Sequence, residues 1–273
     1  MTRTTIVVPA YNEEHTIVRL LERVRAQHLE GVQFELVVVD DGSTDATARL
    51  LEARPDLYDT FVRRKHNGGK GAAVRDALAV ASGDYVLFQD ADLEYDPADY
   101  SKLFSPVLSH DADVVLGSRL IASPVTRVHY FWHKVGNHGL TLLFNVLNNT
   151  TFTDIYSCYV LFRRSLIDPA ELNTSGWQQQ AEILSLLADR AASIYEVPIN
   201  YYGRTYDEGK KIRATDAVAV VTTIVRERAL SAIAGLGVPR RGASTRSAGP
   251  RAGRTNGKAG DGVQRGAGQR PKL

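Results

Sequence analysis

Three acidic residues stand at alternate positions after an apolar run, in the segment YVLFQDADLEYDP at 85–97. They are Asp90, Asp92 and Glu94, and carboxylates this close repel one another unless a cation or hydrogen-bond donors offset the repulsion. A D-x-D element at the end of a strand suits a hard divalent cation, because such ions take oxygen ligands and commonly bridge carboxylates to substrate phosphates. The segment therefore predicts a bound Mg²⁺ or Mn²⁺. For so short a motif, the alternative is an acidic turn that caps the helix beginning near Pro97.

Polar clusters follow two earlier apolar runs, as PAYNEE at 9–14 and as DDGSTD at 40–45. Ligands in open α/β sheets bind beyond the carboxyl ends of the strands. The three clusters would therefore converge on one ligand if the sheet is parallel. In that arrangement Asp41 is placed to accept hydrogen bonds from a nucleotide base or ribose, and Tyr11 could stack on a base. A helix cap is also expected in the second cluster, but it does not explain Asp41.

Two glycine-containing segments could contact an anion. HNGGKGAAV at 66–74 is not a Walker A loop, because Ala follows where Ser or Thr should bind Mg²⁺. It predicts a turn that opens a helix at 71, with free N–H groups that could face an anion. GRTYDEGKKIR at 203–213 has four cations, two acids and two glycines, which suits a mobile loop that closes over an anionic substrate. The alternative for this segment is a solvated surface loop.

The elements that must position these residues alternate between short β-branched runs and helical patterns. This alternation predicts an α/β fold with a mostly parallel central sheet and helices on both faces. Strands are expected at 4–10, 34–41, 58–64, 85–90 and 112–119, and helices at 13–27, 43–53, 71–82 and 98–109. The less regular second half predicts helices at 128–149, 178–192 and 214–236, and strands within 152–164 and 193–204.

The composition changes after Gly237, where Gly, Arg, Ala, Ser and Pro dominate. Residues 235–273 hold nine Lys or Arg and one Asp, so this segment carries +8 while the rest of the chain carries −6, given the net charge of +2. Such a segment cannot bury a core, and we expect a catalytic domain at 1–237 followed by a disordered basic tail at 238–273. The tail would be attracted to an anionic membrane surface. It has no aromatic residue for base stacking, so no specific nucleic acid is expected.

Compartment and membrane signals point to a cytoplasmic protein. The single Cys158 fits a reducing compartment. The apolar run near the N-terminus is too short for a signal peptide. The nearest candidate for a membrane span, at 217–237, is broken by Arg226, Glu227 and Arg228. We therefore expect a cytoplasmic protein that rests peripherally on the inner face of the membrane.

The ordered set of motifs carries a resemblance to a known family. IVVPAYNEE, VVVDDGSTD, NGGKGAAV, ASGDYVLFQDADLEYDP and DVVLGSR occur in this order and together resemble the inverting family 2 glycosyltransferases, which have the GT-A fold. TDIYSCYVLFRR and YYGRTYDEGKKI resemble the branch that contains dolichyl- and polyprenyl-phosphate mannosyl- and glucosyltransferases. The match covers about 4–230, with C-terminal helices on the acceptor side.

The resemblance implies a role for each matching position. The residues that would bind the nucleotide sugar are Pro9, Tyr11, Glu13, Asp41 and Asp90, with Arg204 and Lys210 closing over the donor phosphates. Those that would hold the metal are Asp90, Asp92 and Glu94, although relatives often have Gln in place of Glu94. Arg119 would contact the acceptor phosphate. His133 and Asn137 would add further contacts to it, and they stand where some relatives have Arg and Ser.

The catalytic set implied in this way is Asp92 and Arg119, with Asp154 and Glu182 as candidates for a base. A hydroxyl acceptor would need a base, whereas a lipid phosphate is already anionic and needs none. Relatives often carry an acid where this chain has Gln180, and its absence favours an acceptor that needs no base. The alternatives are a turn cap for Asp154 and an exposed helix position for Glu182.

The predicted function is the metal-dependent transfer of a hexose from GDP-mannose or UDP-glucose to a polyprenyl phosphate. One alternative is transfer to a hydroxyl on a glycan or a small molecule, and another is sugar-nucleotide binding without transfer. A nucleotidyltransferase is disfavoured, because PAYNEE stands where those enzymes usually have a Gly-rich, Arg-containing loop. The aromatic helix at 128–149 could lie at the lipid interface, and its alternatives are core packing or the surface of a homo-oligomer.

Overall fold

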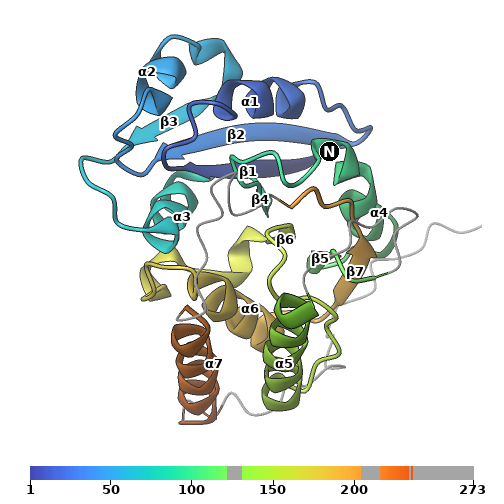
Figure 1. Cartoon of the computed structure of the whole chain (residues 1–273). Helices are drawn as coiled ribbons and strands as arrows, with labels where there is room; N and C mark the ends of the chain where they lie inside the picture. Colours follow the sequence, from blue (N-terminus) through green and yellow to red (C-terminus); the bar gives the residue numbers. More distant parts are fainter. Residues whose placement is uncertain (122–130, 204–215, 234, 236–273) are drawn as a thin grey trace, which may run out of the picture. The chain divides into compact units, whose positions relative to one another are not determined.

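Seven strands form one sheet in the computed structural model, which describes residues 1–121, 131–203, 216–233 and 235, with the backbone alone at 131–133 and 216. The strand order is β3-β2-β1-β4-β6-β5-β7 (Figure 1). The strands are β1 (Thr2–Ala10), β2 (Val32–Asp40), β3 (Thr60–Arg63), β4 (Tyr85–Phe88), β5 (Val114–Ser118), β6 (Val160–Arg163) and β7 (Ile194–Pro198).

The sheet is parallel except for one strand. β1 pairs in parallel with β2 and with β4, β2 pairs in parallel with β3, and β5 pairs in parallel with β7. β6 is antiparallel to both of its neighbours, β4 and β5, so these two strands run in the same direction. The carboxyl ends of β1, β2, β4 and β5 therefore lie at one edge of the sheet. The prediction of a mostly parallel α/β sheet is confirmed.

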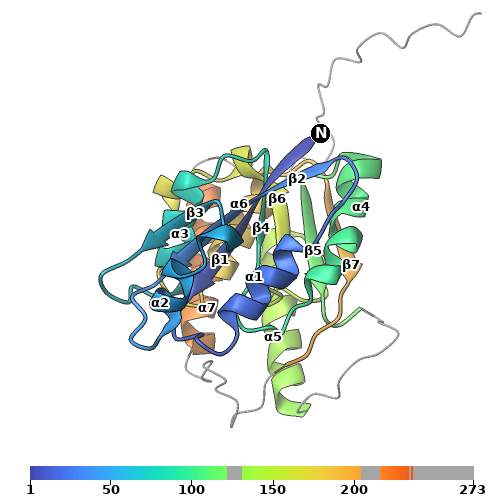
Figure 2. The same ribbon diagram turned by 90° about the horizontal axis from the view of Figure 1, so that it is seen from above.

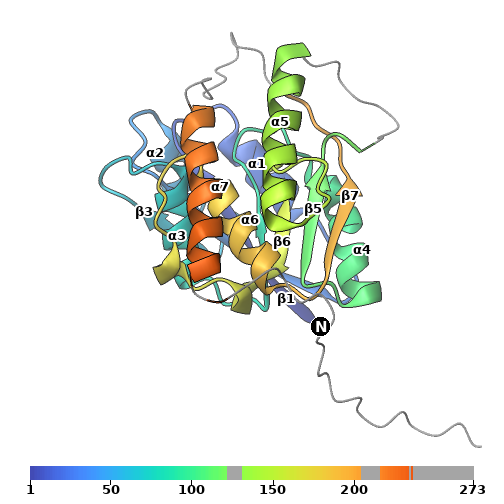
Figure 3. The same ribbon diagram turned by 90° about the horizontal axis from the view of Figure 1, so that it is seen from below.

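Helices cover both faces of the sheet. α1 and α4 lie on one face, while α3 and α6 lie on the other, with α5 and α7 packed beside α6 (Figures 2 and 3). The helices are α1 (Ile17–Arg25), α2 (Thr47–Glu52), α3 (Lys70–Val80), α4 (Tyr100–His110), α5 (Phe131–Asn148), α6 (Gln179–Arg190) and α7 (Asp216–Ile233). Short 3₁₀ turns are η1 (Pro55–Leu57), η2 (Pro97–Asp99), η3 (Arg164–Leu166) and η4 (Pro169–Glu171).

The central strands are apolar on consecutive residues because both of their faces are covered. Ile6, Val7 and Val8 of β1 are fully buried, and so are 37–39 of β2 and 86–87 of β4. Continuous runs of this kind are typical of a sheet that lies between two layers of helices. The surface helix α1 instead buries one stripe, formed by Ile17, Leu20, Leu21 and Val24.

The first helix begins at Ile17 and not at the predicted residue 13, because the preceding residues form a loop at the sheet edge. Asn12, which directly precedes the predicted helix, has a positive φ of 53°, so the chain turns at this point. All described residues belong to one compact unit. The expected tail at 238–273 lies outside the described residues, so the domain boundary stays a prediction.

Candidate active site

The loops after β1 and β2 are hydrogen-bonded to each other at the carboxyl edge of the sheet. The Asn12 amide donates to Ser43 Oγ at 3.0 Å, and its side-chain oxygen accepts from the Thr44 amide at 2.8 Å. The Glu13 amide donates to Thr47 Oγ1 at 2.8 Å, and the Asp41 amide donates to the Ala10 carbonyl at 2.8 Å.

These contacts bring the predicted nucleotide-binding residues of the two loops together. Tyr11 and Glu13 are partly exposed at the same edge as Asp41. Pro9 lies within β1, opposite Val39 of β2.

Asp41 is 3% exposed and already has three donors. It accepts from the amides of Gly68 at 3.0 Å and Gly69 at 2.8 Å, and Arg64 Nε lies 3.1 Å away. Burial raises the pKa of Asp41 above its ordinary value, although these donors act to lower it. The Gly71 amide donates to the Ser175 carbonyl at 2.7 Å. The expectation that these amides are free to face an anion is therefore wrong for Gly68, Gly69 and Gly71.

Glycine is required at position 69 on two grounds. Its φ is +87°, a region that favours glycine, and a Cβ there would lie 2.4 Å from the Ser175 carbonyl oxygen. The tight turn delivers Lys70 at the first position of α3, where its side chain can reach the end of β4.

Each of the three acids after β4 has a partner within the chain. Asp90 forms an ion pair with Lys70, Asp92 Oδ1 accepts from the Glu94 amide at 3.1 Å, and Glu94 Oε2 accepts from Tyr201 Oη at 2.7 Å. Leu93, between the last two acids, has a positive φ of 62°. Within the described ranges, no three His, Cys, Asp or Glu side chains are grouped so that they could hold a metal ion. The metal-binding role of Asp90, Asp92 and Glu94 stays a prediction.

A two-carboxylate metal site does fit these residues. Asp90 and Asp92 come from the same strand end, and both side chains are partly exposed at the edge where the loops of Tyr11 and Asp41 meet. Mg²⁺ usually keeps several waters and is bound by one or two carboxylates together with substrate phosphates. Glu94 differs from these two acids in that its Oε2 accepts a hydrogen bond from Tyr201.

Lys70 is a charged residue of the site that the sequence analysis did not single out. Besides Asp90, its Nζ lies 4.0 Å from Cys158 Sγ and 5.3 Å from the centre of the Trp177 ring. Burial acts to lower the pKa of Lys70, but Asp90 and the neighbouring acidic groups raise it above its ordinary value, so the side chain is cationic. A Lys that opens a helix directly after a Gly-Gly turn was the signal that could have identified it. Cys158 is buried.

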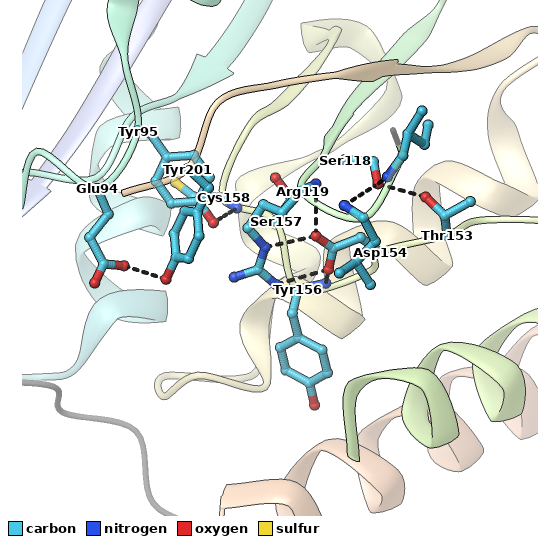
Figure 4. Close-up of polar contacts among 12 residues, drawn as sticks. Glu94, Tyr95, Ser118, Arg119, Thr153, Asp154, Tyr156, Ser157, Cys158 and Tyr201 are labelled. Atoms are coloured by element: carbon cyan, nitrogen blue, oxygen red, sulfur yellow. Dashed lines mark hydrogen bonds and ion pairs between the residues drawn. The ribbon is translucent and has the colours of Figure 1, made fainter. Parts of the chain in front are cut away.

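The end of β5 carries a buried ion pair between Arg119 and Asp154 (Figure 4). Arg119 Nε donates to Asp154 Oδ2 at 2.7 Å, Nη2 donates to Oδ1 at 2.9 Å, and the Arg119 amide adds a bond of 3.1 Å to Oδ2. The Asp154 side chain is fully buried and that of Arg119 is 13% exposed. Burial acts to raise the pKa of Asp154. The charge and the hydrogen bonds of Arg119 outweigh this effect, so the pKa of Asp154 lies below its ordinary value.

These contacts correct the expectation that Asp154 could act as a base. A base must reach the acceptor proton, and both oxygens of Asp154 are engaged below the surface. Glu182 needs the same correction, because it is 1% exposed and accepts from the amides of Asn173 at 2.8 Å and Thr174 at 3.0 Å. The alternative reading of Glu182 as an exposed helix position is also wrong. Both acids hold loops in place.

Tyr201 is a second residue that the sequence analysis did not identify. Its ring lies 4.9 Å from the Arg119 guanidinium carbon and 5.2 Å from the ring of Tyr95, and its hydroxyl reaches Glu94 (Figure 4). The Tyr202 amide donates to the Glu94 carbonyl at 2.9 Å, and Tyr95 and Tyr201 form an isolated antiparallel bridge. The chain after β7 therefore connects the acidic loop to Arg119.

The remaining predicted residues are only partly described. Asn137 is partly exposed on α5, which lies beside α6 and α7. The side chain of His133 and the whole of Arg204 and Lys210 lie outside the described residues. Their assigned roles stay predictions.

Comparison with known proteins decides the family. The profile of Glycosyl transferase family 2 matches residues 5–169, which is more than half of the chain and includes all four strand ends described above. The chain belongs to this family. The dolichol-phosphate mannosyltransferase of Pyrococcus furiosus is 27% identical over 211 residues, covering 76% of this chain and 59% of that protein. The dolichyl-phosphate beta-glucosyltransferase of Dictyostelium discoideum is 27% identical over 244 residues, covering 82% and 73%.

Solved structures confirm the predicted GT-A fold of this family 2 chain. Glucosyl-3-phosphoglycerate synthase from Mycobacterium tuberculosis, in complex with Mn²⁺, UDP-glucose and phosphoglyceric acid, superposes with a TM-score of 0.63 at 23% identity, covering 84% of this chain and 80% of that one. The low-salt glycan biosynthesis hexosyltransferase Agl6 of Haloferax volcanii is 31% identical over 205 residues, which are 73% of this chain but only 48% of that protein. The chain thus spans about half to three quarters of the length of these curated relatives.

Proposed function

We propose that this family 2 chain is an inverting hexosyltransferase that moves a hexose from a GDP- or UDP-sugar to a polyprenyl phosphate. The family match supports glycosyl transfer, and the names of the Pyrococcus and Dictyostelium relatives support a dolichyl-phosphate type of acceptor. The carboxyl edge of the sheet supplies the donor site. There Pro9, Tyr11, Glu13 and Asp41 would bind the nucleoside, and Arg204 and Lys210 would close over the phosphates.

Asp90 and Asp92 would hold a Mg²⁺ or Mn²⁺ ion. When bound, the ion would neutralise charge on the departing nucleoside diphosphate. The protein's own contribution is to orient the donor so that its anomeric carbon faces the acceptor on the side opposite the leaving group. The likeness to a structure that contains Mn²⁺ and UDP-glucose supports this choice of ion and donor class.

The observation that carries the acceptor class is the engagement of both base candidates. Asp154 is bound to Arg119 and Glu182 to the loop at 173–174, so neither is positioned to take a proton from an acceptor hydroxyl. A phosphate acceptor is already anionic and needs no base. Because Asp154 uses Nε and Nη2 of Arg119, the acceptor phosphate would approach the Nη1 edge of the guanidinium.

A lipid acceptor also requires a surface that meets the bilayer, and α5 and α7 offer one. Within the described residues, seven of the twelve strongly exposed large apolar side chains lie on these two helices. They are Val135, Leu142, Val146, Val218, Val225, Leu230 and Ile233. The exposed side chains that the structure describes on α5 and α7 include Lys134 and Arg226 but no acid, which suits an anionic lipid surface. Within the same residues, no helix has the length and apolarity needed to cross a bilayer. We propose peripheral binding at the cytoplasmic face.

Transfer of labelled sugar tests the proposal. The full chain is incubated with a panel of GDP- and UDP-sugars, polyprenyl phosphate and Mn²⁺, and the product is extracted into chloroform. We expect one donor to give an extractable product that is labile to mild acid, and we expect EDTA to prevent its formation. Asp92→Ala should abolish transfer without loss of folding, whereas the surface control Asp56→Asn should not affect it.

The outcome of the same assay separates the alternatives. A labelled product that forms with a hydroxyl acceptor and stays in the aqueous phase would show that the acceptor is a glycan or a small molecule and not a lipid. Binding of a sugar nucleotide without transfer to any acceptor would show that the protein binds sugar nucleotides but is not a transferase. Near-normal transfer by Asp92→Ala would contradict the assignment of the acids.

A further inference from the structure

The cation that pairs with Asp90 in this structure belongs to the protein. Lys70 Nζ contacts Asp90 Oδ1, so a lysine ammonium lies against one oxygen of a carboxylate that is proposed to bind a divalent ion. The pair is neither deeply buried nor free, because the Lys70 side chain is 21% exposed and that of Asp90 is 19% exposed. Because the two side chains are paired, Asp90 is neutralised without a metal. Because both side chains are partly exposed, the pair can be reached from outside.

A divalent ion and the ammonium cannot both lie against the same carboxylate oxygen, because their positive charges repel at that distance. The ammonium must therefore move before Oδ1 of Asp90 can act as a ligand. Its flexible four-carbon stem allows such a move. Nζ already lies over the face of the Trp177 ring, 5.3 Å from its centre, and this attraction for a cation remains when the ammonium leaves Asp90.

We propose that Lys70 is a resident counter-ion that holds Asp90 ready for the metal and is displaced when the metal binds. This inference rests on the proposed metal-dependent function. Lys70 thereby keeps the acids after β4 from repelling one another in the metal-free protein, and it makes binding of the bare ion weaker than two carboxylates alone would allow. Tight metal binding would then require the diphosphate of the donor, which adds negative charge to the site.

A purely structural ion pair predicts a different response to substitution. If Lys70 only stabilised the fold, its removal would lower stability equally with and without metal. If it competes with the metal, its removal lowers stability without metal and strengthens metal binding. Only a competing Lys70 predicts that its removal raises the affinity for metal while it lowers the stability of the metal-free protein. Measuring both quantities therefore separates the two roles.

The test is a titration of the full chain with Mn²⁺ in the absence of nucleotide. The electron paramagnetic resonance signal of free Mn²⁺ measures how much of the ion is bound. We expect Lys70→Met to bind Mn²⁺ more tightly than the wild type, on the order of ten-fold, because one competing charge is gone. Lys70→Arg keeps the charge and should bind as the wild type does. Lys102→Met is the matched control, because Lys102 pairs with Asp99 at 2.6 Å and not with the acids after β4. The melting temperature of Lys70→Met should fall without Mn²⁺ and rise more than that of the wild type when Mn²⁺ is added.

A measurement on the wild type covers the case in which Lys70→Met does not fold. Acetylation of Lys70 by an amine-reactive ester, followed by mass spectrometry, should become faster when Mn²⁺ displaces the side chain, while Lys102 should not change. Equal or weaker Mn²⁺ binding by Lys70→Met, or an unchanged rate of acetylation, would overturn the inference while leaving metal-dependent transfer intact. Absence of Mn²⁺ binding to the wild type, with or without nucleotide, would overturn the proposed function as well.

Discussion

Asp154 and Asp90 are both paired with a cation at the carboxyl edge of the sheet, but the two pairs differ in burial and geometry. Asp154 is fully buried and held by two guanidinium bonds, whereas the Asp90–Lys70 pair is about one fifth exposed on each side. A buried pair cannot lose one partner without leaving an uncompensated charge, and a partly exposed ammonium can be exchanged. The first pair therefore maintains the structure, and the second is suited to ligand exchange.

Asp154→Asn tests the structural role of the first pair. Because the substitution leaves the Arg119 charge buried without its partner, we expect a loss of about 3–5 kcal/mol in the free energy of unfolding. Urea denaturation of both proteins at pH 7 measures the loss. Asp56→Asn, which breaks the exposed pair with Arg54, serves as the control and should leave the free energy of unfolding nearly unchanged. A loss for Asp154→Asn as small as that of the control would contradict the account.

The same pair gives a pH dependence with a definite sign. The pKa of Asp154 is lowered in the folded protein, so its contribution to stability is present above the unfolded pKa of about 3.9 and is lost as the pH falls through the lower folded pKa. The difference in unfolding free energy between the wild type and Asp154→Asn should therefore stay constant from about pH 7 to about pH 5 and shrink only below about pH 4. Denaturation curves across this range provide the check. A difference that already shrinks above pH 5 would contradict the assigned direction.

At the scale of elements, the turns at the strand ends decide which side chains meet. The turn at Gly68 and Gly69 aims its amides at Asp41 and delivers Lys70 to Asp90, while the segment after β7 places Tyr201 between Glu94 and Arg119. The strands fix the edge of the sheet, and these two connections arrange the charged groups along it.

A matched pair of glycine substitutions tests the role of the first turn. Gly69→Ala should destabilise the protein by about 2–4 kcal/mol, because it combines a positive φ with a Cβ that would lie 2.4 Å from the Ser175 carbonyl oxygen. Gly136→Ala, inside α5 with nothing within 4 Å of the new Cβ, should stabilise it by about 0.5–1 kcal/mol. Chemical denaturation measures both variants. Equal effects of the two substitutions would show that the turn is not constrained.

The elements were predictable from the sequence, because apolar periodicity reports burial directly. The strands of the sheet and the acids after β1, β2 and β4 lie where the pattern placed them. The partners of those acids were not predictable. Glu94 and Tyr201 are 107 residues apart, and Arg119 and Asp154 are 35 apart, so only the folded chain brings them together. For the same reason the sequence could not show that Asp154 and Glu182 are already engaged.

At the scale of the whole molecule, the apolar side chains of α5 and α7 that remain exposed form a surface with no described acid. Leu142 is 65% exposed and Val146 is 71% exposed, both on α5, while Ile233 of α7 is 83% exposed. We propose that this surface, together with the basic tail at 238–273, brings the site to an anionic membrane. The two contributions differ in kind, because one is apolar and the other electrostatic.

Sedimentation with vesicles tests the apolar contribution. Leu142→Glu should lower binding to anionic vesicles by about ten-fold or more, because an apolar side chain worth about 1.5–3 kcal/mol on burial is replaced by a charge. Leu108→Glu is the control, since Leu108 is 51% exposed but lies on α4. Equal binding by the two variants would mean that the surface of α5 and α7 does not meet the lipid.

Deletion of 238–273 tests the electrostatic contribution in the same assay. Each Lys or Arg near an anionic leaflet contributes about 1 kcal/mol, so the deletion should weaken binding to anionic vesicles and leave binding to neutral vesicles unchanged. Sugar transfer to a short-chain, water-soluble acceptor should not change. Unaltered binding of the shortened chain to anionic vesicles would remove the tail from the account.

The most direct test of the central claim is calorimetry of Mn²⁺ uptake by the full chain, with and without GDP or UDP. We expect the wild type to take up Mn²⁺ at Asp90 and Asp92, one of the two nucleotides to strengthen this uptake, and Asp92→Ala to abolish it. Absence of Mn²⁺ uptake by the wild type under all of these conditions would contradict the assignment of the acids after β4 as a metal and diphosphate site.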